Sequence, residues 1–318
     1  MEFAVEAHQI GKRYGGLSAL EELSLVVRAG EILGVLGPNG AGKTTAIRIL
    51  TTILSPSTGS FMVAGVPHTR PGSIRRRIGV LPESAGYPDR QTAEEYVVYH
   101  ARLYGHSRAS ARGVARSLLE EVQLSERAGS SIGTFSRGMR QRLGIARALV
   151  NDPHVVFLDE PTLGLDPAGQ RQILGTIRAI AEDRGATVLL STHLLAEVEE
   201  TCTRVVILNR GRLMADGTVS EVARRAAAPR SGSLRVEPEL VEHAASILRG
   251  APGVSEVVGV DGRAGWLTVM FRPARDQLFD SAPNDVVRAL LDAGVPLLFF
   301  ELEGARLSDA FLAMTEAA

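Results

Sequence analysis

The sequence has few of the features that mark secreted, membrane-spanning or polyanion-binding proteins. Its 318 residues include one cysteine, Cys202, so neither an internal disulfide nor a multi-cysteine metal site can form. The longest apolar runs fall far short of the roughly 18 residues that a membrane span needs. The first residues lack the basic and apolar regions of a secretory signal. We therefore expect a protein that stays in the cytoplasm.

An excess of one charge is also missing. Lysine and arginine number 35 and aspartate and glutamate 36, which gives a formal net charge of −1. This balance gives no support to nucleic-acid binding by the whole chain, and we expect no nucleic-acid partner. The length fits two domains of ordinary size, and 45% hydrophobic with 22% charged residues is typical of a chain that buries real cores.

Hydrophobic patterning predicts an α/β domain over residues 1–225. Short apolar runs predict buried strands at residues 31–36, 154–158, 186–190 and 204–208, and amphipathic segments predict helices at 43–54 and 167–183. Residues from about 90 to 150 are expected to form a helical insert. Thr92 and Glu95 have the spacing of a capping box at its start.

A second, smaller domain is expected over residues 226–318. Residues 224–233 are small, basic and rich in Pro, Gly and Ser, which is the composition of a linker. The pattern beyond them predicts strand, helix, strand, strand, helix, strand, followed by a last helix at 307–314. That order is compatible with an α+β domain of the ferredoxin-like type.

A phosphate-binding loop stands between the first predicted buried strand and the helix that follows. The segment matches G-x-x-x-x-G-K-[ST] in the expected strand–loop–helix context and consists of Gly37, Pro38, Asn39, Gly40, Ala41, Gly42, Lys43 and Thr44, with Thr45 next in the helix. Its backbone N–H groups and the helix N-terminus are expected to hold ATP phosphates. Lys43 is expected to reach the β- and γ-phosphates, and the Thr44 hydroxyl to bind Mg²⁺.

Two carboxylates, Asp159 and Glu160, follow the apolar strand at 154–158. Ligands bind at the carboxyl ends of strands in open parallel sheets. Asp159 is therefore expected to hold Mg²⁺, through water, and Glu160 to polarise the attacking water as the catalytic base. A solvated strand end is the alternative for this pair taken alone.

The remaining motifs give the chain a resemblance to ABC-type ATPases. Residues 135–142 (FSRGMRQR) resemble the signature motif of that family, and they precede the acidic strand as the family's motif does. The family's order of motifs is complete over about residues 2–225. It also includes Tyr14, the turn at Gly164–Pro167, and Ser191-Thr192-His193. The resemblance implies a P-loop NTPase cassette with a mixed sheet core and a helical subdomain.

The resemblance also implies a head-to-tail dimer in which each ATP lies between one P-loop and the partner's signature motif. Ser136 and Gly138 would then contact the γ-phosphate bound on a second copy, and His193 would sense that phosphate as a catalytic residue. Tyr14 would stack on adenine, as an aromatic residue before the first paired strands does in this family. Asp166 would lie at the dimer seam; a simple turn residue before Pro167 is the alternative.

Two positions depart from the common family pattern. Glu83 stands where most cassettes have a Gln, and a carboxylate there can still bind Mg²⁺ or orient water. Arg137 replaces the first glycine of the signature pair. These variants, with the added C-terminal domain, resemble the ATPase subunits of ABC-2-type exporters, including drug-resistance systems. A regulatory or dimerisation role is expected for the second domain.

The expected function is ATP hydrolysis that drives export through separate transmembrane permease subunits, which would hold the chain at the inner face of the membrane. Arginines at 75–77 and at 108, 112 and 116 would face that partner or anionic lipid, or would simply be solvated. A soluble ABC ATPase acting on ribosomes or DNA is the alternative. A nucleotide-gated module without hydrolysis is disfavoured because Lys43, Asp159, Glu160 and His193 are all present.

Overall fold

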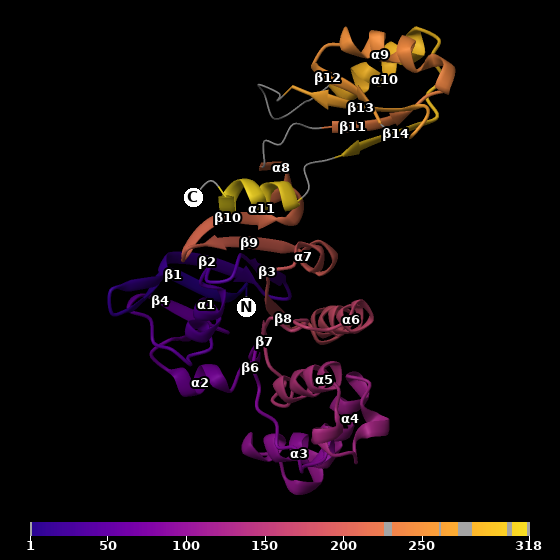
Figure 1. Cartoon of the computed structure of the whole chain (residues 1–318). Coiled ribbons are helices and arrows are strands. Elements are labelled where there is room, and N and C mark those ends of the chain that lie inside the picture. Colours follow the sequence, from indigo (N-terminus) through magenta and orange to yellow (C-terminus); the bar gives the residue numbers. More distant parts are fainter. Residues whose placement is uncertain (1, 226–230, 261, 273–281, 304–306, 317–318) are drawn as a thin grey trace. The chain divides into compact units, whose positions relative to one another are not determined.

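The computed structural model describes residues 2–225, 231–260, 262–272, 282–303 and 307–316 (Figure 1). The chain divides into two compact units, Met1–Val219 and Ser220–Ala318. The predicted boundary between residues 225 and 226 directly follows α8 (Val219–Arg225), and residues 226–230 of the predicted linker lie outside the described residues. None of the described helices is long and apolar enough to cross a membrane.

A six-stranded sheet with the order β10-β9-β3-β8-β7-β6 forms the centre of the first unit. All neighbouring strands are parallel except β10, which runs antiparallel to β9. Every residue of β3, β7 and β8 is buried, as expected for parallel strands covered on both faces. The strands are β3 (Ile32–Leu36), β6 (Ile78–Leu81), β7 (Val155–Asp159), β8 (Thr187–Thr192), β9 (Arg204–Asn209) and β10 (Arg212–Thr218).

A second sheet in this unit is antiparallel, with the order β2-β1-β4-β5. Its long strands are irregular: the β1–β2 register shifts between Ala7 and Ile10, where Gln9 has φ 48°, and Glu22 on β2 has φ 47°. Such bulges bend and twist a strand pair. The strands are β1 (Phe3–Tyr14), β2 (Leu17–Arg28), β4 (Thr58–Val63) and β5 (Val66–Pro67).

Helices cover the two faces of the central sheet differently. In Figure 1, α5, α6 and α7 line one side, whereas α1 and the antiparallel sheet lie on the other. Alternate residues of β7 enter two separate cores: Val156 and Leu158 pack on the side of α5 and α6, and Val155 and Phe157 on the side of α1. The helices of this unit are α1 (Lys43–Leu50), α2 (Pro71–Arg75), α3 (Ala93–Leu103), α4 (Arg108–Glu121), α5 (Arg137–Ala148), α6 (Pro167–Arg184) and α7 (Leu195–Thr201), with 3₁₀ turns η1 (Ser125–Arg127) and η2 (Ile132–Thr134).

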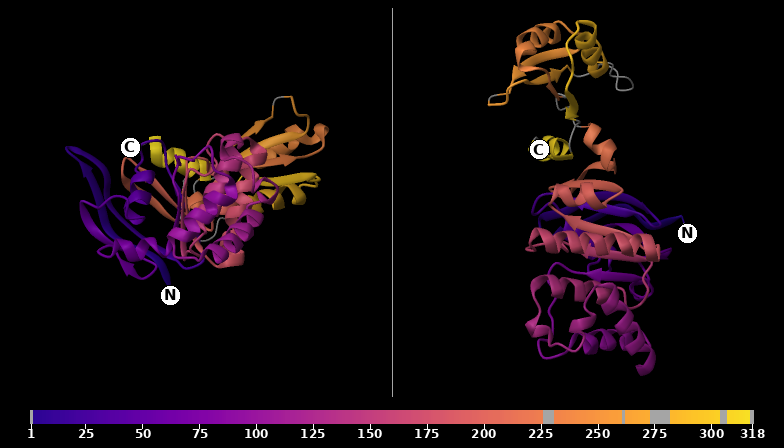
Figure 2. Two further views of the ribbon diagram at one scale, coloured as in Figure 1. Left: turned by 90° about the horizontal axis from the view of Figure 1, so that it is seen from below. Right: turned by 90° about the vertical axis from the view of Figure 1, so that its right-hand side faces the viewer.

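The expected helical segment is present as a lobe at one end of this unit, visible in both figures as α3, α4 and the start of α5 (Figure 2). The capping box predicted from Thr92 and Glu95 is confirmed: each side chain bonds to the other residue's backbone N–H. The helix predicted at 43–54 ends earlier, at Leu50. Thr52 adopts φ 62°, and the N–H groups of Thr52 and Ile53 bond to Ile49 and Arg48, which closes the helix as a Schellman motif.

The second unit contains the predicted βαββαβ order. Its four strands form an antiparallel sheet with the order β12-β13-β11-β14, and α9 and α10 lie on one face of it (Figures 1 and 2), which confirms the ferredoxin-like expectation. Apolar residues of both helices and the sheet form one core. The elements are β11 (Ser231–Arg235), η3 (Pro238–Leu240), α9 (Val241–Arg249), β12 (Val254–Gly259), β13 (Trp266–Phe271), α10 (Ala282–Asp292), β14 (Phe299–Glu303) and α11 (Leu307–Glu316).

Candidate nucleotide site

The predicted phosphate loop connects β3 to α1. Gly42 precedes α1 with φ 101°, and Gly40 has φ 80°, both in the region that favours glycine. A Cβ at Gly37 would lie 2.4 Å from the Leu208 carbonyl oxygen of β9, so only glycine fits there. These constraints curl the loop over the N-terminus of α1, a conformation in which loop N–H groups and the helix N-terminus together form an anion site.

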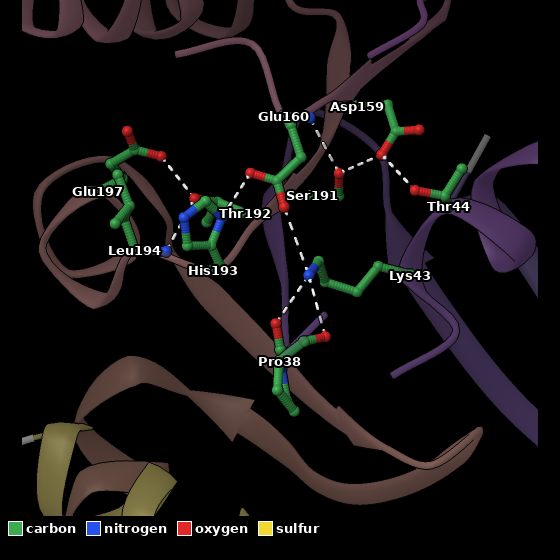
Figure 3. A network of polar contacts seen from close by, with 11 residues as sticks. Pro38, Lys43, Thr44, Asp159, Glu160, Ser191, Thr192, His193, Leu194 and Glu197 are labelled. Carbon is green, nitrogen blue, oxygen red and sulfur yellow. Dashed lines mark hydrogen bonds and ion pairs between the residues drawn. The ribbon is translucent and has the colours of Figure 1, made fainter. Parts of the chain in front are cut away.

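A chain of charged contacts connects the loop to the ends of β7 and β8 (Figure 3). The Lys43 ammonium donates to the Gly37 carbonyl at 2.7 Å and lies 3.3 Å from Oε1 of Glu160. Oε2 of Glu160 is 2.9 Å from Nδ1 of His193. Lys43 and Glu160 are buried, so their attraction is screened less than that of a surface pair. The three residues predicted to be catalytic are thus in contact.

Glu160 also has a constrained backbone. Its φ is 49°, and its N–H bonds to both the carbonyl oxygen and the hydroxyl of Ser191. Positive φ is uncommon for a residue other than glycine, and such strain is concentrated at functional sites. The geometry directs the carboxylate away from the sheet and towards Lys43 and His193.

Asp159 lies beneath the loop, next to Glu160. Its Oδ1 accepts hydrogen bonds from the hydroxyls of Ser191 at 2.5 Å and Thr44 at 3.2 Å (Figure 3). Burial raises the pKa of the Asp159 carboxyl, and the nearby carboxylates of Glu83 and Glu160 add to this, against the two hydroxyl hydrogen bonds, which lower it. An additional cation beside Asp159 would relieve this concentration of negative charge.

These residues fit a magnesium ion. Among the described residues there is no group of three or more His, Cys, Asp or Glu side chains that could hold a metal by themselves. Mg²⁺ is usually bound by one or two protein oxygens together with substrate phosphates and water. The Thr44 hydroxyl and the Asp159 carboxylate supply hard oxygen ligands of this kind at the phosphate loop.

An open cleft of about 750 Å³ brings most of the predicted site residues together. Their side chains or backbone come from four segments: the end of β1, the phosphate loop with the start of α1, the loop after β6, and the ends of β7 and β8. The predicted residues that line the cleft are Tyr14, Pro38, Asn39, Gly40, Ala41, Gly42, Lys43, Thr44, Thr45, Glu83, Glu160 and His193. Gly37 and Asp159 lie beneath this lining, bonded to Lys43 and Thr44.

Tyr14 is placed differently from the expectation. It was expected before the first paired strands, but it is the last residue of β1 and pairs with Leu17 across the first hairpin. Its ring is 47% exposed at the rim of the cleft, and the Lys12 ammonium lies 5.5 Å from the ring centroid. An exposed aromatic face at this rim is suited to stacking on a base.

Besides Gly37 and Asp159, three predicted residues do not line the cleft in this chain, and these three lie away from it. Ser136 caps α5 by accepting from Met139 N–H, and Gly138 follows in the first turn. Asp166 caps α6 by accepting from Gly169 N–H at 3.1 Å. Ser136 and Asp166 are exposed. Their roles towards a second copy remain predictions.

Sequence reasoning gave no role in the site to Ser191, although Ser191 belongs to the predicted motif at residues 191–193, and it missed Arg210. Ser191 bonds to both carboxylate residues because β8 runs parallel to β7, with Ser191 directly opposite Asp159. Its place at the end of the next buried strand was the available signal. Arg210, with φ 48° in the turn between β9 and β10, also lines the cleft. No sequence motif marks Arg210, because it reaches the cleft only through the position of this turn. The turn is held there by backbone hydrogen bonds of Gly211 with Ala41 and with Glu21.

Comparisons with known proteins agree with this geometry. Residues 20–163 match the family model described as ABC transporter. The doxorubicin resistance ATP-binding protein DrrA of Mycobacterium tuberculosis is 34% identical over 99% of this chain and 94% of its own length. The Nod factor export ATP-binding protein I of Burkholderia thailandensis is 40% identical over 67% of this chain and 70% of its own length.

Solved structures point the same way. An ATP-binding subunit of an ABC transporter is 34% identical with a TM-score of 0.63, covering 70% of this chain and 92% of that one. An ATP-binding cassette solved as a dimer in a post-hydrolysis state with ADP and Pi is 25% identical, with a TM-score of 0.62. The match covers 67% of this chain and 98% of that one. The chain therefore belongs to the ABC transporter family as an ATP-binding, ATP-hydrolysing subunit of the exporter group that includes drug-resistance ATPases.

Proposed function

We propose that this chain dimerises head to tail around two Mg-ATP molecules and drives export of a substrate through separate permease subunits. The assembled contact of Lys43, Glu160 and His193 beside the phosphate loop is the observation that carries this proposal. The names of the relatives, which are resistance and export ATP-binding proteins, support the direction of transport.

In the proposed reaction, the P-loop N–H groups and Lys43 hold the phosphates, and Tyr14 stacks on adenine. Thr44 and Asp159, with Glu83 at the edge of the cleft, would hold Mg²⁺, which neutralises charge on the phosphate oxygens. Lys43 exchanges its contact with Glu160 for the γ-phosphate. Glu160 is then free to orient the attacking water, and His193, already within 2.9 Å of Glu160, contacts the γ-phosphate.

The proposal of a dimer is supported by the position of the signature segment. Ser136 and Gly138 lie at the start of α5, where the helix dipole favours an anion, yet neither lines the cleft of its own chain. A second copy in head-to-tail arrangement would bring them to its γ-phosphate. The same arrangement accounts for the exposed Asp166 as a seam residue, and a related cassette was solved as a dimer.

For the permease we propose the groove between the helical lobe and the end of α1 as the docking surface. The groove has a volume of about 290 Å³ and includes Ile53 and Tyr104, which are 60% and 44% exposed. Leu103, 64% exposed, precedes Tyr104. Exposed apolar side chains gathered around a groove mark an interaction site. Such docking would hold the chain at the inner face of the membrane.

Part of the basic cluster expected to meet that partner has a local role. Arg75 donates to the hydroxyl of Thr52, and Arg77 donates to the Ala64 carbonyl at 2.7 Å. Arg116 lies 3.9 Å from a Glu94 carboxylate. We therefore assign the docking energy to the exposed apolar side chains of the groove and give a supporting role to Arg75, the one of these three arginines that lines it.

The Glu160→Gln variant tests the proposed reaction and dimer together. We expect it to bind ATP, to release phosphate at least about 100-fold more slowly than the parent, and to form a dimer in the presence of ATP and Mg²⁺ by light scattering. Lys43→Ala, which loses the phosphate contact, is the matched control and should stay monomeric. Near-parental phosphate release by Glu160→Gln would eliminate Glu160 as the base.

The permease partner is tested by affinity purification of the ATP-bound Glu160→Gln chain from detergent-solubilised membranes. We expect a multi-span membrane protein to co-purify, and Leu103→Asp combined with Tyr104→Asp to abolish its recovery without preventing the ATP-dependent dimer. Recovery of only ribosomal proteins or nucleic acid would replace the transporter proposal with a soluble ABC ATPase.

A further inference from the structure

A buried carboxylate lies behind His193 and has no part in the reaction described so far. Glu197, on α7, is 3% exposed. Its Oε2 accepts a hydrogen bond from the Thr192 hydroxyl at 2.6 Å, whereas its Oε1 is buried and has no hydrogen-bond partner within the described structure (Figure 3). Glu197 thus has one specific polar contact, directed at the residue before His193.

Packing does not account for a glutamate at this position. Burying a carboxylate with an unsatisfied oxygen is unfavourable, and an apolar side chain of similar volume would avoid that desolvation penalty. Val198, next to Glu197, and Cys202, directly after α7, pack against β3 at Gly34, so these neighbouring positions meet the sheet with apolar and sulfur atoms. Thr201, at the end of α7, is also buried and its hydroxyl has no hydrogen-bond partner within the described structure. The single hydrogen bond to Thr192 is what distinguishes Glu197 from such a residue.

That hydrogen bond fixes the orientation of the Thr192 hydroxyl. Thr192 is fully buried at the end of β8, where it pairs with Leu36 of β3. A hydroxyl has one proton, and here the proton is donated to Glu197, so a lone pair is left to accept the Leu194 N–H at 3.0 Å. The backbone is therefore held on both sides of His193, by the β ladder before it and by this acceptor after it.

His193 depends on such support. Its side chain is 36% exposed, and the described contact of its ring is the one with Glu160 at 2.9 Å. With that one contact at its tip, the position of the imidazole depends on the backbone that carries it. We propose that Glu197 is a positioning residue that acts through Thr192 and Leu194 to hold His193 against Glu160; this inference rests on the catalytic role proposed above for His193.

The inference predicts a loss in turnover rather than in substrate binding. The P-loop, Lys43 and Tyr14 do not contact Glu197, so the KM for Mg-ATP should stay within about twofold in Glu197→Ala. Misplacing a catalytic group by about 1 Å reduces rates by up to about 100-fold, and we expect kcat to fall by about 10- to 100-fold. Glu197→Gln keeps an acceptor oxygen for Thr192 and should recover most of kcat.

The experiment measures steady-state phosphate release and melting temperature for four single variants and one double variant. Glu200→Ala is the matched control, because Glu200 is a carboxylate on the same helix whose ion pair with Arg178 lies at the surface. It should keep parental kcat. His193→Ala and the double variant Glu197→Ala with His193→Ala separate the two roles: the double variant should be no slower than His193→Ala alone.

Each outcome supports or overturns one assignment. A further loss of kcat in the double variant, or equal losses in Glu197→Ala and Glu197→Gln, would overturn positioning through His193. If His193→Ala keeps parental kcat, the catalytic role of His193 fails instead. Should Glu197→Ala fold poorly, Thr192→Val removes the same hydroxyl relay, and Thr192→Ser retains it. We expect a lower kcat in Thr192→Val than in Thr192→Ser, and equal rates would contradict the relay.

Discussion

The nucleotide cleft and the signature segment belong to the same predicted site, but this chain builds them to different degrees. In the cleft, Lys43, Glu160 and Asp159 are buried: Lys43 forms an ion pair with Glu160, and Ser191 bonds to both Glu160 and Asp159. In the signature segment, Ser136 is exposed and its hydrogen bond stays within its own helix, and a Cβ at Gly138 would meet only the Leu165 side chain, at the ordinary contact distance of 3.8 Å.

This difference separates what one chain can do from what needs a second. Buried charges are held where their partners are, so the cleft is pre-organised to receive phosphates. The exposed start of α5, with its positive dipole end, has no comparable charged partner in the part of the chain that the structure describes. We expect ATP binding to depend on the first region alone and hydrolysis to depend on both.

The largest predicted effects come from disabling each region separately. Lys43→Ala should weaken ATP binding and abolish hydrolysis. Gly138→Asp should leave ATP binding intact, because Asp is favoured at a helix start and the position has room for a side chain, but should reduce hydrolysis at least about 100-fold by repelling the partner's phosphate. Nucleotide affinity and phosphate release measure the two losses. Weakened ATP binding in Gly138→Asp would place the signature segment in the cleft of its own chain.

Mixing these two inactive variants tests the same comparison in one assay. In a head-to-tail heterodimer both defects fall in one site and the other site is intact. At most about half of the encounters between chains in an equal mixture pair the two variants, so up to about a quarter of the parental activity should return if the sites act independently. No recovery would argue against shared sites.

A smaller effect is predicted for Ser191→Ala, which removes a support of the cleft rather than a reacting group. The variant loses the hydrogen bond to Asp159 and the hydroxyl acceptor of Glu160 N–H. We expect kcat to fall by about tenfold. Thr187→Val is the matched control: it removes a buried hydroxyl at the opposite end of the same strand, where Thr187 accepts from Gly30 N–H. Equal losses in both variants would show that general destabilisation is responsible.

The sequence predicted the pre-organised region well because its signals are local. The glycines of the phosphate loop and the apolar run before Asp159 belong to continuous segments whose geometry follows from neighbouring residues. The strands β1 and β2 were not predicted residue by residue, since bulges at Gln9 and Glu22 interrupt the period-two alternation that marks a strand.

Residues brought together only by tertiary structure were harder to foresee. Ser191 meets Asp159 through the register of two strands that are far apart in sequence, and Arg210 reaches the cleft through a turn held by Gly211. Glu197 could not be distinguished from an exposed helix carboxylate, because α7 is too short for a periodic pattern to assign its buried face.

Arg210 offers a finer test of the cleft. Arg210 lines the cleft and is exposed, so its positive charge attracts a polyanion through solvent. Arg210→Ala should raise the KM for ATP by about two- to fivefold with little change in kcat. Arg212→Ala is the control, because Arg212 is 71% exposed, bonds to Glu21 and does not line this cleft. The difference between the two variants should shrink at high salt. An unchanged KM would remove Arg210 from the nucleotide site.

The smallest predicted effect lies outside both regions, in the helical lobe. Burial, with a smaller contribution from the positive charge of Arg147, lowers the pKa of His100 to about 4. The imidazole of His100 takes up a proton near pH 6.5 in the unfolded chain but only near pH 4 in the folded chain. The stability that the folded state gains from the neutral imidazole is therefore complete above pH 6.5 and is lost as the pH falls towards 4. Because His100 keeps part of its surface in water, its contribution is small. Between pH 7 and pH 4.5 we expect the melting temperature of His100→Gln to fall by only about 2 °C less than that of the parent chain. Identical falls in the two proteins would assign the acid sensitivity to other groups, including the carboxylates of the cleft.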